Sequence, residues 1–226
     1  MEWGFAKAQK QKNIRAIHEA FARIRPGEKV LEISSKSMQE NGEDLSAFFL
    51  QKYVPSLDKK TPVEGVFQSA KTFEKGGPYK DLLYAAPREA KRDQRLKNSG
   101  KLVCFTFEGK EFPLEPTTVF YDYIYLNALL ENESLAKTVL QYDAFTDIEF
   151  NPNKSLNCQA KAAAAFVALS RLGLIEQVKD FEAFLKLNDY SPAVNDSRLQ
   201  KKKTKASGTL DEDKSAEEKV DLNNAN

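Results

Sequence analysis

The chain has 226 residues, 41% apolar and 30% charged, which is enough apolar material for one ordinary domain core. Its 34 Lys and Arg residues against 33 Asp and Glu residues give a net charge of +1, which excludes a uniformly basic nucleic-acid coat and an acidic disordered protein. Two cysteines without CxxC spacing, one histidine and no apolar run near ~18 residues argue against a disulfide framework, a metal site and a membrane helix, so we expect a cytoplasmic protein with no metal or cofactor.

Apolar residues at helical spacing predict a first helix from Ala6 to Ile24. His18 lies beside its apolar stripe, and we interpret it as a partly buried or surface helix histidine because no nucleophile motif accompanies it. Residues 30–33 alternate like a short strand and lead into the hydroxyl-rich loop Ser34-Ser35-Lys36-Ser37. A loop of this kind can hold a phosphate or can be ordinary turn chemistry, and the sequence leaves both interpretations open.

A helix is predicted from Thr61 to Glu74, with Thr61 as its cap, and Gly76-Gly77-Pro78 ends it. On this helix Glu64, Gln68 and Lys71 form one polar row beside an apolar arc. The row can be a solvated face closed by a capping box, with contacts worth a few tenths of a kcal/mol. It can also line a cleft, where a half-buried lysine would have a lowered pKa and act as a nucleophile beside a proton-moving carboxylate.

Charge and periodicity divide the remainder of the chain. The segment 75–101 carries a charge of +5 and the segment 108–149 a charge of −7, so the two segments are expected to face different partners. We predict a hairpin over 102–114 with its turn at Gly109, a helix over 118–140, a strand over 146–150, a buried and central helix over 158–174, and an amphipathic helix over 175–187.

The C-terminal stretch from Asn195 has no aromatic residue and 14 charges in 32 positions, a composition typical of disorder. Before it, strands are interspersed with helices of unequal length. The sequence therefore predicts a single compact α+β domain over residues 1–194, mainly helical with a small sheet, and a disordered charged tail over 195–226.

Several segments resemble the NADAR superfamily. Residues 63–73, VEGVFQSAKTF, resemble its VE-x-x-FQ-x-x-K-x-F signature, and residues 45–48 resemble its LSNF segment. Residues 128–149 are similar to its stretch that runs from an AL pair to an LVE strand. The loops 31–37, 76–79 and 150–160 resemble the branch that acts as antitoxins to DarT-type DNA ADP-ribosyltransferases. The resemblance covers about Val30 to Leu169.

This resemblance implies an N-glycosidase with a NADAR-like domain. One branch of the family hydrolyses riboflavin precursors, and the antitoxin branch removes ADP-ribose from guanine bases in DNA and so reverses a DarT-type toxin. The family's Asp-x-x-Trp-Gly is replaced here by residues 154–158, which favours the antitoxin branch. The resemblance implies catalytic roles for Glu64, Lys71 and Glu149, and the expected substrate-binding residues are Ser34, Ser35, Lys36, Phe48, Gln68, Gly77, Tyr79, Asn157 and Gln159.

The residues are compatible with this chemistry, because cleavage of a ribose C1 to nitrogen bond needs negative charge near the sugar and a nucleophile or activated water. Lys71 could attack C1 to give a Schiff base while Glu64 or Glu149 moves protons, and the segment 75–101 could contact DNA phosphates. Two alternatives remain: an N-glycosidase acting on a free nucleotide-like metabolite such as a riboflavin precursor, and a non-catalytic ADP-ribose or nucleic-acid binding module in which Lys71 only binds phosphate.

Overall fold

A computed structural model describes residues 7–153 and 155–189. The chain divides into two units, Met1–Asn188 and Asp189–Asn226. The predicted tail over 195–226 lies outside the described residues, and the predicted domain boundary at 194 stays a prediction.

The described residues confirm an α+β fold with more helix than strand. The first part of the chain forms α1 (Lys7–Ile24), β1 (Val30–Glu32), α2 (Glu40–Asp44), β2 (Gln51–Val54), η1 (Pro55–Leu57), β3 (Lys59–Pro62), α3 (Val63–Ser69) and β4 (Lys71–Phe73). The middle forms η2 (Lys80–Leu83), α4 (Pro87–Arg92), α5 (Arg95–Asn98), β5 (Leu102–Phe107) and β6 (Lys110–Phe112). The last described part forms α6 (Val119–Leu130), α7 (Glu133–Val139), β7 (Ala144–Thr146), α8 (Gln159–Arg171), η3 (Ile175–Lys179) and α9 (Phe181–Asp189).

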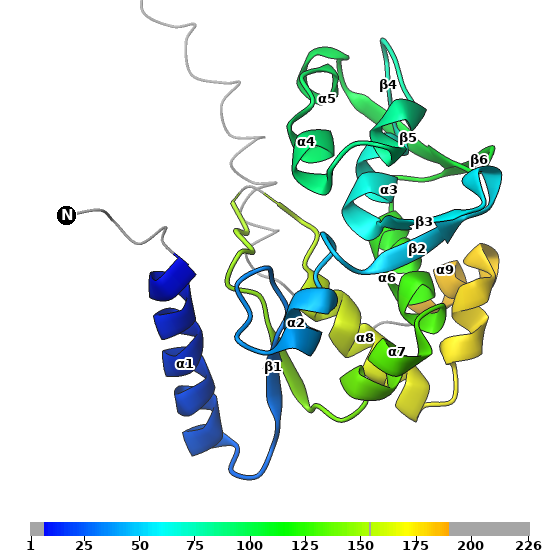
Figure 1. The fold of residues 1–226 in the computed structure, drawn as a ribbon. Coiled ribbons are helices and arrows are strands. Elements are labelled where there is room, and N and C mark those ends of the chain that lie inside the picture. The colour runs from blue at the N-terminus through cyan, green and yellow to red at the C-terminus, as the bar shows by residue number, and fades with distance from the viewer. Residues whose placement is uncertain (1–6, 154, 190–226) are drawn as a thin grey trace, which may run out of the picture. The chain divides into compact units, whose positions relative to one another are not determined.

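Three small sheets hold these elements together within the described residues. β1 pairs in parallel with β7, so that Leu31 lies opposite Phe145, and α1 lies beside β1 (Figure 1). β2 and β3 form an antiparallel pair. β4, β5 and β6 form an antiparallel sheet, in which the predicted hairpin of β5 and β6 is confirmed. Glu108 and Gly109 both have positive φ at its two-residue turn, as a type I′ turn requires.

Among the described helices, α6 contributes the largest number of buried residues, and not the predicted helix over 158–174. Nine of the twelve residues of α6 are buried, including Phe120 and Tyr125. α8, which lies within the predicted range 158–174, buries only one face, and Lys161 and Ala164 are exposed on the other. The alanine-rich composition of α8 hid this difference, because alanine is compatible with both a buried and an exposed face.

The predicted helix over 118–140 is interrupted after Leu130 and continues as α7. At the break, the Glu131 carboxylate accepts hydrogen bonds from the Lys52 ammonium and the Tyr53 backbone N–H, and Asn132 donates to the Gln51 carbonyl. The break therefore brings two polar side chains onto β2. The last predicted helix is likewise divided, into η3 and α9.

The predicted helix from Thr61 to Glu74 is wrong at both ends. Thr61 belongs to β3, and its hydroxyl is buried without a hydrogen-bond partner, so it caps nothing. The first free N–H groups of α3, those of Val63 and Glu64, instead donate to the Leu50 and Ala47 carbonyls at 2.9 and 2.8 Å. The helix ends at Ser69 because the next residues pair with β5.

The predicted strand over 146–150 is also wrong, since β7 ends at Thr146. The Asp147 carboxylate accepts hydrogen bonds from the backbone N–H groups of Glu149 and Phe150 at 3.0 and 3.1 Å. A side chain that bonds its own backbone two and three residues ahead makes a turn, which ends the strand.

Candidate functional site

The polar row on α3 is present and is buried. All seven residues of α3 are buried, and the helix packs against α4 and α6 (Figure 1). The Gln68 amide nitrogen donates to the Glu64 carboxylate at 2.8 Å, and the Lys71 ammonium donates to the Gln68 amide oxygen at 2.7 Å. Lys71 lies at the start of β4, not on the helix, and its long side chain reaches back to the row. Of the two interpretations of the row, a solvated face is therefore wrong.

Lys71 has the environment of a nucleophilic amine. Its ammonium lies 4.7 Å from the centre of the Phe67 ring. Burial lowers the pKa of Lys71 from its ordinary value of 10.5 to about 8, while the charge of Glu64 raises the pKa and the charge of Lys91 lowers it. At pH 7 a pKa of about 8 leaves roughly one-tenth of the amine neutral, about 300-fold more than an ordinary lysine.

Two of the expected substrate-binding residues support this row. Gly77 has a φ of +86°, and a β-carbon there would lie 2.3 Å from the Lys71 carbonyl oxygen, so only glycine lets the loop pass behind Lys71. Phe48 contributes its ring, over which the Lys91 ammonium lies at 5.3 Å from the centre. Lys91 also pairs with Glu64, at 3.4 Å.

Glu149, Ser35 and Lys36 form a second cluster, which Lys10 of α1 joins. The Glu149 carboxylate accepts hydrogen bonds from the Ser35 hydroxyl at 2.7 Å and the Lys10 ammonium at 3.0 Å, and the Lys36 ammonium lies 3.8 Å away. Burial raises the pKa of Glu149, but these hydrogen bonds and charges outweigh it and hold the pKa below its ordinary value. Glu149 is thus an ionised carboxylate held by cations, and its catalytic role stays a prediction.

The loop of residues 34–37 has turn chemistry, one of the two interpretations that its sequence leaves open. The Ser37 N–H donates to the Ser34 carbonyl at 3.0 Å, and the Lys36 N–H donates to the Ser34 hydroxyl at 3.2 Å. Ser34 is fully buried, so its hydroxyl shapes the loop. The Ser35 hydroxyl is buried and is bonded to Glu149 and Lys36, and binding of an anion by this loop stays a prediction.

Gln159 links the two clusters through the backbone of Ala47. Its amide oxygen accepts the Ala47 N–H at 2.7 Å, and its amide nitrogen donates to the Ile33 carbonyl at 3.0 Å. The Ala47 carbonyl in turn accepts the Glu64 N–H at 2.8 Å. A continuous path of hydrogen bonds therefore runs from the strand end before Ser34 to the first turn of α3.

Tyr79 and Asn157, the remaining expected residues, have partners outside the two clusters. The Tyr79 hydroxyl hydrogen-bonds Ser99, and the Arg95 guanidinium lies 4.5 Å from the centre of the Tyr79 ring. Asn157 is half-buried, and its carbonyl accepts a hydrogen bond from Ser155 at 3.2 Å. No described contact joins Asn157 to either cluster. The helix histidine, His18, is half-buried as predicted and meets the Thr146 hydroxyl at 3.0 Å.

Asp147 is a candidate functional residue that the sequence did not single out, and Lys91 was expected only as part of the DNA-facing segment 75–101. Burial raises the pKa of Asp147 to about 6, so this carboxyl can exchange a proton near neutral pH. Tyr121, which is buried, is within electrostatic reach of both Glu64 and Asp147. Asp147 lies two residues before the expected Glu149, and the sequence alone does not tell which of the two carboxylates is functional.

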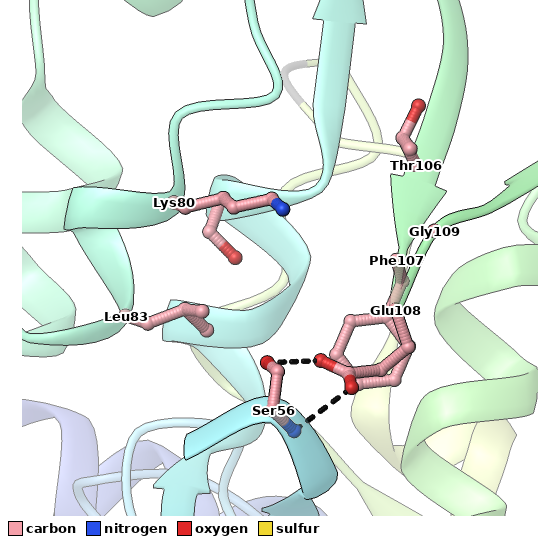
Figure 2. A pocket seen from close by; sticks show the side chains of 8 residues that line it. Ser56, Lys80, Leu83, Thr106, Phe107, Glu108 and Gly109 are labelled. Atoms are coloured by element: carbon pink, nitrogen blue, oxygen red, sulfur yellow. Dashed lines mark hydrogen bonds between the residues drawn. The ribbon is translucent and has the colours of Figure 1, made fainter.

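A pocket of about 210 Å³ lies elsewhere among the described residues, between η1, η2 and the hairpin of β5 and β6 (Figure 2). In it, the Glu108 carboxylate accepts hydrogen bonds from the Ser56 N–H at 2.9 Å and the Ser56 hydroxyl at 2.7 Å. None of the expected site residues lines this pocket.

The described residues contain no group of three or more His, Cys, Asp or Glu side chains that could hold a metal ion. Cys104 and Cys158 are both free thiols. No helix in the described part of the chain is long and apolar enough to cross a membrane.

A half-buried amine of lowered pKa, connected to a buried carboxylate on an α+β fold, defines a site suited to nucleophilic or proton-transfer chemistry. The family model of the DarT1-associated NADAR antitoxins matches residues 1–198. The chain therefore belongs to the family of DarT1-associated NADAR antitoxins. Membership supports an antitoxin role in association with a DarT1 toxin. No curated protein matches the chain.

Proposed function

We propose that this antitoxin is an N-glycosidase that removes ADP-ribose from guanine bases in DNA and so reverses the modification made by the toxin. The observation that carries the proposal is the Lys71 amine, which is buried, has a pKa of about 8 and is connected through Gln68 to Glu64. A phosphate ligand alone would need neither the lowered pKa nor the buried carboxylate.

The proposed reaction uses this arrangement. The neutral Lys71 amine attacks C1 of the ribose, the new Nζ–C1 bond forms, and the bond from C1 to the guanine nitrogen breaks. Glu64 takes the proton that the amine loses and returns it to the departing guanine. The sugar ring then opens to a Schiff base on Lys71, and water hydrolyses it to release ADP-ribose and the free amine.

The remaining expected residues bind the rest of the substrate in this proposal. Ser35 and Lys36 bind the diphosphate, and Phe48 offers a ring near the row. Of the basic residues over 75–101, Arg95 is occupied by Asp81 and Asp93, at 2.6 and 2.8 Å. Six others are exposed and have no ion pair among the described residues, so they are available to DNA phosphates: Lys75, Lys80, Arg88, Arg92, Lys97 and Lys101.

The test uses DNA that carries ADP-ribosylated guanine. The wild-type protein and Lys110→Ala, which removes an exposed lysine outside the segment 75–101, should release free ADP-ribose and restore the base. Lys71→Ala should release ADP-ribose at less than about 1% of the wild-type rate while keeping its fold, since this side chain is off the apolar core. Borohydride added during turnover should leave a reduced sugar adduct on Lys71, detected by mass spectrometry.

Other outcomes identify the alternatives. Turnover of a riboflavin precursor without turnover of modified DNA would assign the chain to the metabolite branch. Binding of ADP-ribose without cleavage of either substrate would identify a binding module. Wild-type rates in Lys71→Ala would refute the nucleophile.

A further inference from the structure

The contact between Lys91 and Glu64 bears on the protonation of Lys71, because the proposed reaction needs a neutral Lys71 amine beside the charged Glu64 carboxylate. A carboxylate close to a lysine stabilises the ammonium form, and the charge of Glu64 does raise the pKa of Lys71. A protonated lysine cannot attack a sugar carbon. The site therefore needs Glu64 for proton transfer and also needs its charge offset at Lys71.

The geometry offers such an offset. Lys91 of α4 lies 3.4 Å from the Glu64 Oε1 atom, the same oxygen that accepts the Gln68 amide at 2.8 Å. Gln68 is neutral and stands between Glu64 and Lys71, and the described ion pairs include none between those two residues. The cation nearest to Glu64 is thus Lys91.

Lys91 also has a second contact at this end of the row. Its ammonium lies over the Phe48 ring at 5.3 Å from the centre, a cation–π contact that favours the position beside Glu64. Phe48 follows Ala47, whose carbonyl accepts the Glu64 N–H. The same segment of chain therefore positions both partners of the ion pair.

Few charged groups are close enough to Lys71 to change its pKa. The titratable groups that act on it are Glu64 from α3 and Lys91 from α4. From β5, the residues paired with β4 are Phe105, Cys104 and Leu102, none of which is charged. On the far side of Glu64, α6 contributes Tyr121, which is neutral because burial raises its pKa well above 10.

We propose that Lys91 is a positioning residue of this site, which holds the Glu64 carboxylate by an ion pair and offsets its charge so that the Lys71 amine can be neutral when substrate binds. This inference rests on the proposed function. The Lys91 side chain is 55% exposed, and it differs from Arg88 and Arg92, its exposed neighbours on α4, in having an ion pair with the row on α3.

The first experiment measures the protonation of Lys71 without substrate, so its result does not depend on the proposed activity. The full chain is labelled briefly with acetic anhydride at pH values from 6 to 11, and the acetylated Lys71 peptide is quantified by mass spectrometry. In Lys91→Gln the midpoint for Lys71 should rise by about 0.5 to 1 pH unit. Lys91→Arg should restore it, and Arg92→Gln, which removes the adjacent exposed charge, should leave it unchanged.

The second experiment records kcat/KM against pH on free ADP-ribosylated guanosine, so that contacts to DNA do not contribute. The rising limb of Lys91→Gln should move to higher pH by the same amount, with a rate at pH 7 lowered about 3- to 10-fold. An unchanged labelling midpoint in Lys91→Gln, or an equal rise in Arg92→Gln, would overturn the role of Lys91. A shifted midpoint with no turnover in any variant, wild type included, would overturn the proposed function and leave the charge offset standing.

Discussion

Substitution of Gly77 by alanine tests whether the loop behind Lys71 positions the amine. The φ of +86° makes a side chain at 77 cost about 1 to 2 kcal/mol in any surroundings. The added β-carbon would also lie 2.3 Å from the Lys71 carbonyl oxygen and 3.3 Å from the Thr72 α-carbon. Both are backbone atoms of a strand paired with β5, so relief requires β4 to shift, at a further cost of about 1 to 3 kcal/mol.

A matched control separates the two contributions. Gly109 has a φ of +75°, and a β-carbon there would meet nothing within 4 Å, so Gly109→Ala should lose only the conformational part, about 1 to 2 kcal/mol. Urea unfolding gives the two free energies of unfolding, and ADP-ribose release from modified DNA gives the rates. Gly77→Ala should be the less stable variant by about 1 to 3 kcal/mol and at least about tenfold slower, because Lys71 is moved away from Gln68. Equal losses of stability together with wild-type turnover in Gly77→Ala would refute the reasoning.

Three further results are expected. Because the pKa of Lys71 in the folded protein is lowered from 10.5 to about 8, the unfolded chain binds more protons between those pH values. The free energy of unfolding should therefore rise with pH in this range by up to about 3 kcal/mol relative to Lys71→Met. Equal pH dependence of the two free energies, measured by urea unfolding, would contradict this. Gln159→Ala leaves the buried Ala47 N–H and the Ile33 carbonyl unpaired. It should lower the melting temperature, because each unpaired group costs about 1 to 3 kcal/mol of stability. Unchanged stability would show that water replaces the amide. Glu149→Gln should bind ADP-ribose several-fold more tightly by calorimetry, because the Glu149 carboxylate no longer competes with the diphosphate for Lys10 and Lys36. Weaker binding would show that Glu149 organises those lysines.

The sequence predicted the elements whose signals are local. The helix α1, the strand β1 and the hairpin of β5 and β6 follow from apolar spacing and turn residues, and they were found within a few residues of their expected bounds. The errors came where a distant segment decides the outcome. The first N–H groups of α3 are taken by carbonyls of the segment 45–50, and β4 leaves the helix because β5 pairs with it.

The candidate site was only partly predictable for the same reason. Glu64 and Gln68 lie four residues apart, so one turn of helix is enough to bring them together. Lys91 was predicted as part of a DNA-facing segment, and its pairing with Glu64 depends on how α4 packs on α3. Lys10 was assigned no role, because its contact with Glu149 spans 139 residues of sequence.

The stability of α3 has a consequence for how the site works. A helix of seven residues is too short to be stable by itself, so α3 exists because the surrounding elements bury it and accept its free N–H groups. Burial of Glu64 and Gln68 in such a helix costs solvation that hydrogen bonds only partly return. Apolar residues at these two positions would stabilise the same packing at lower cost. The polar row therefore lowers the stability of the fold, which is the cost expected if Lys71, whose pKa burial lowers to about 8, carries the proposed chemistry.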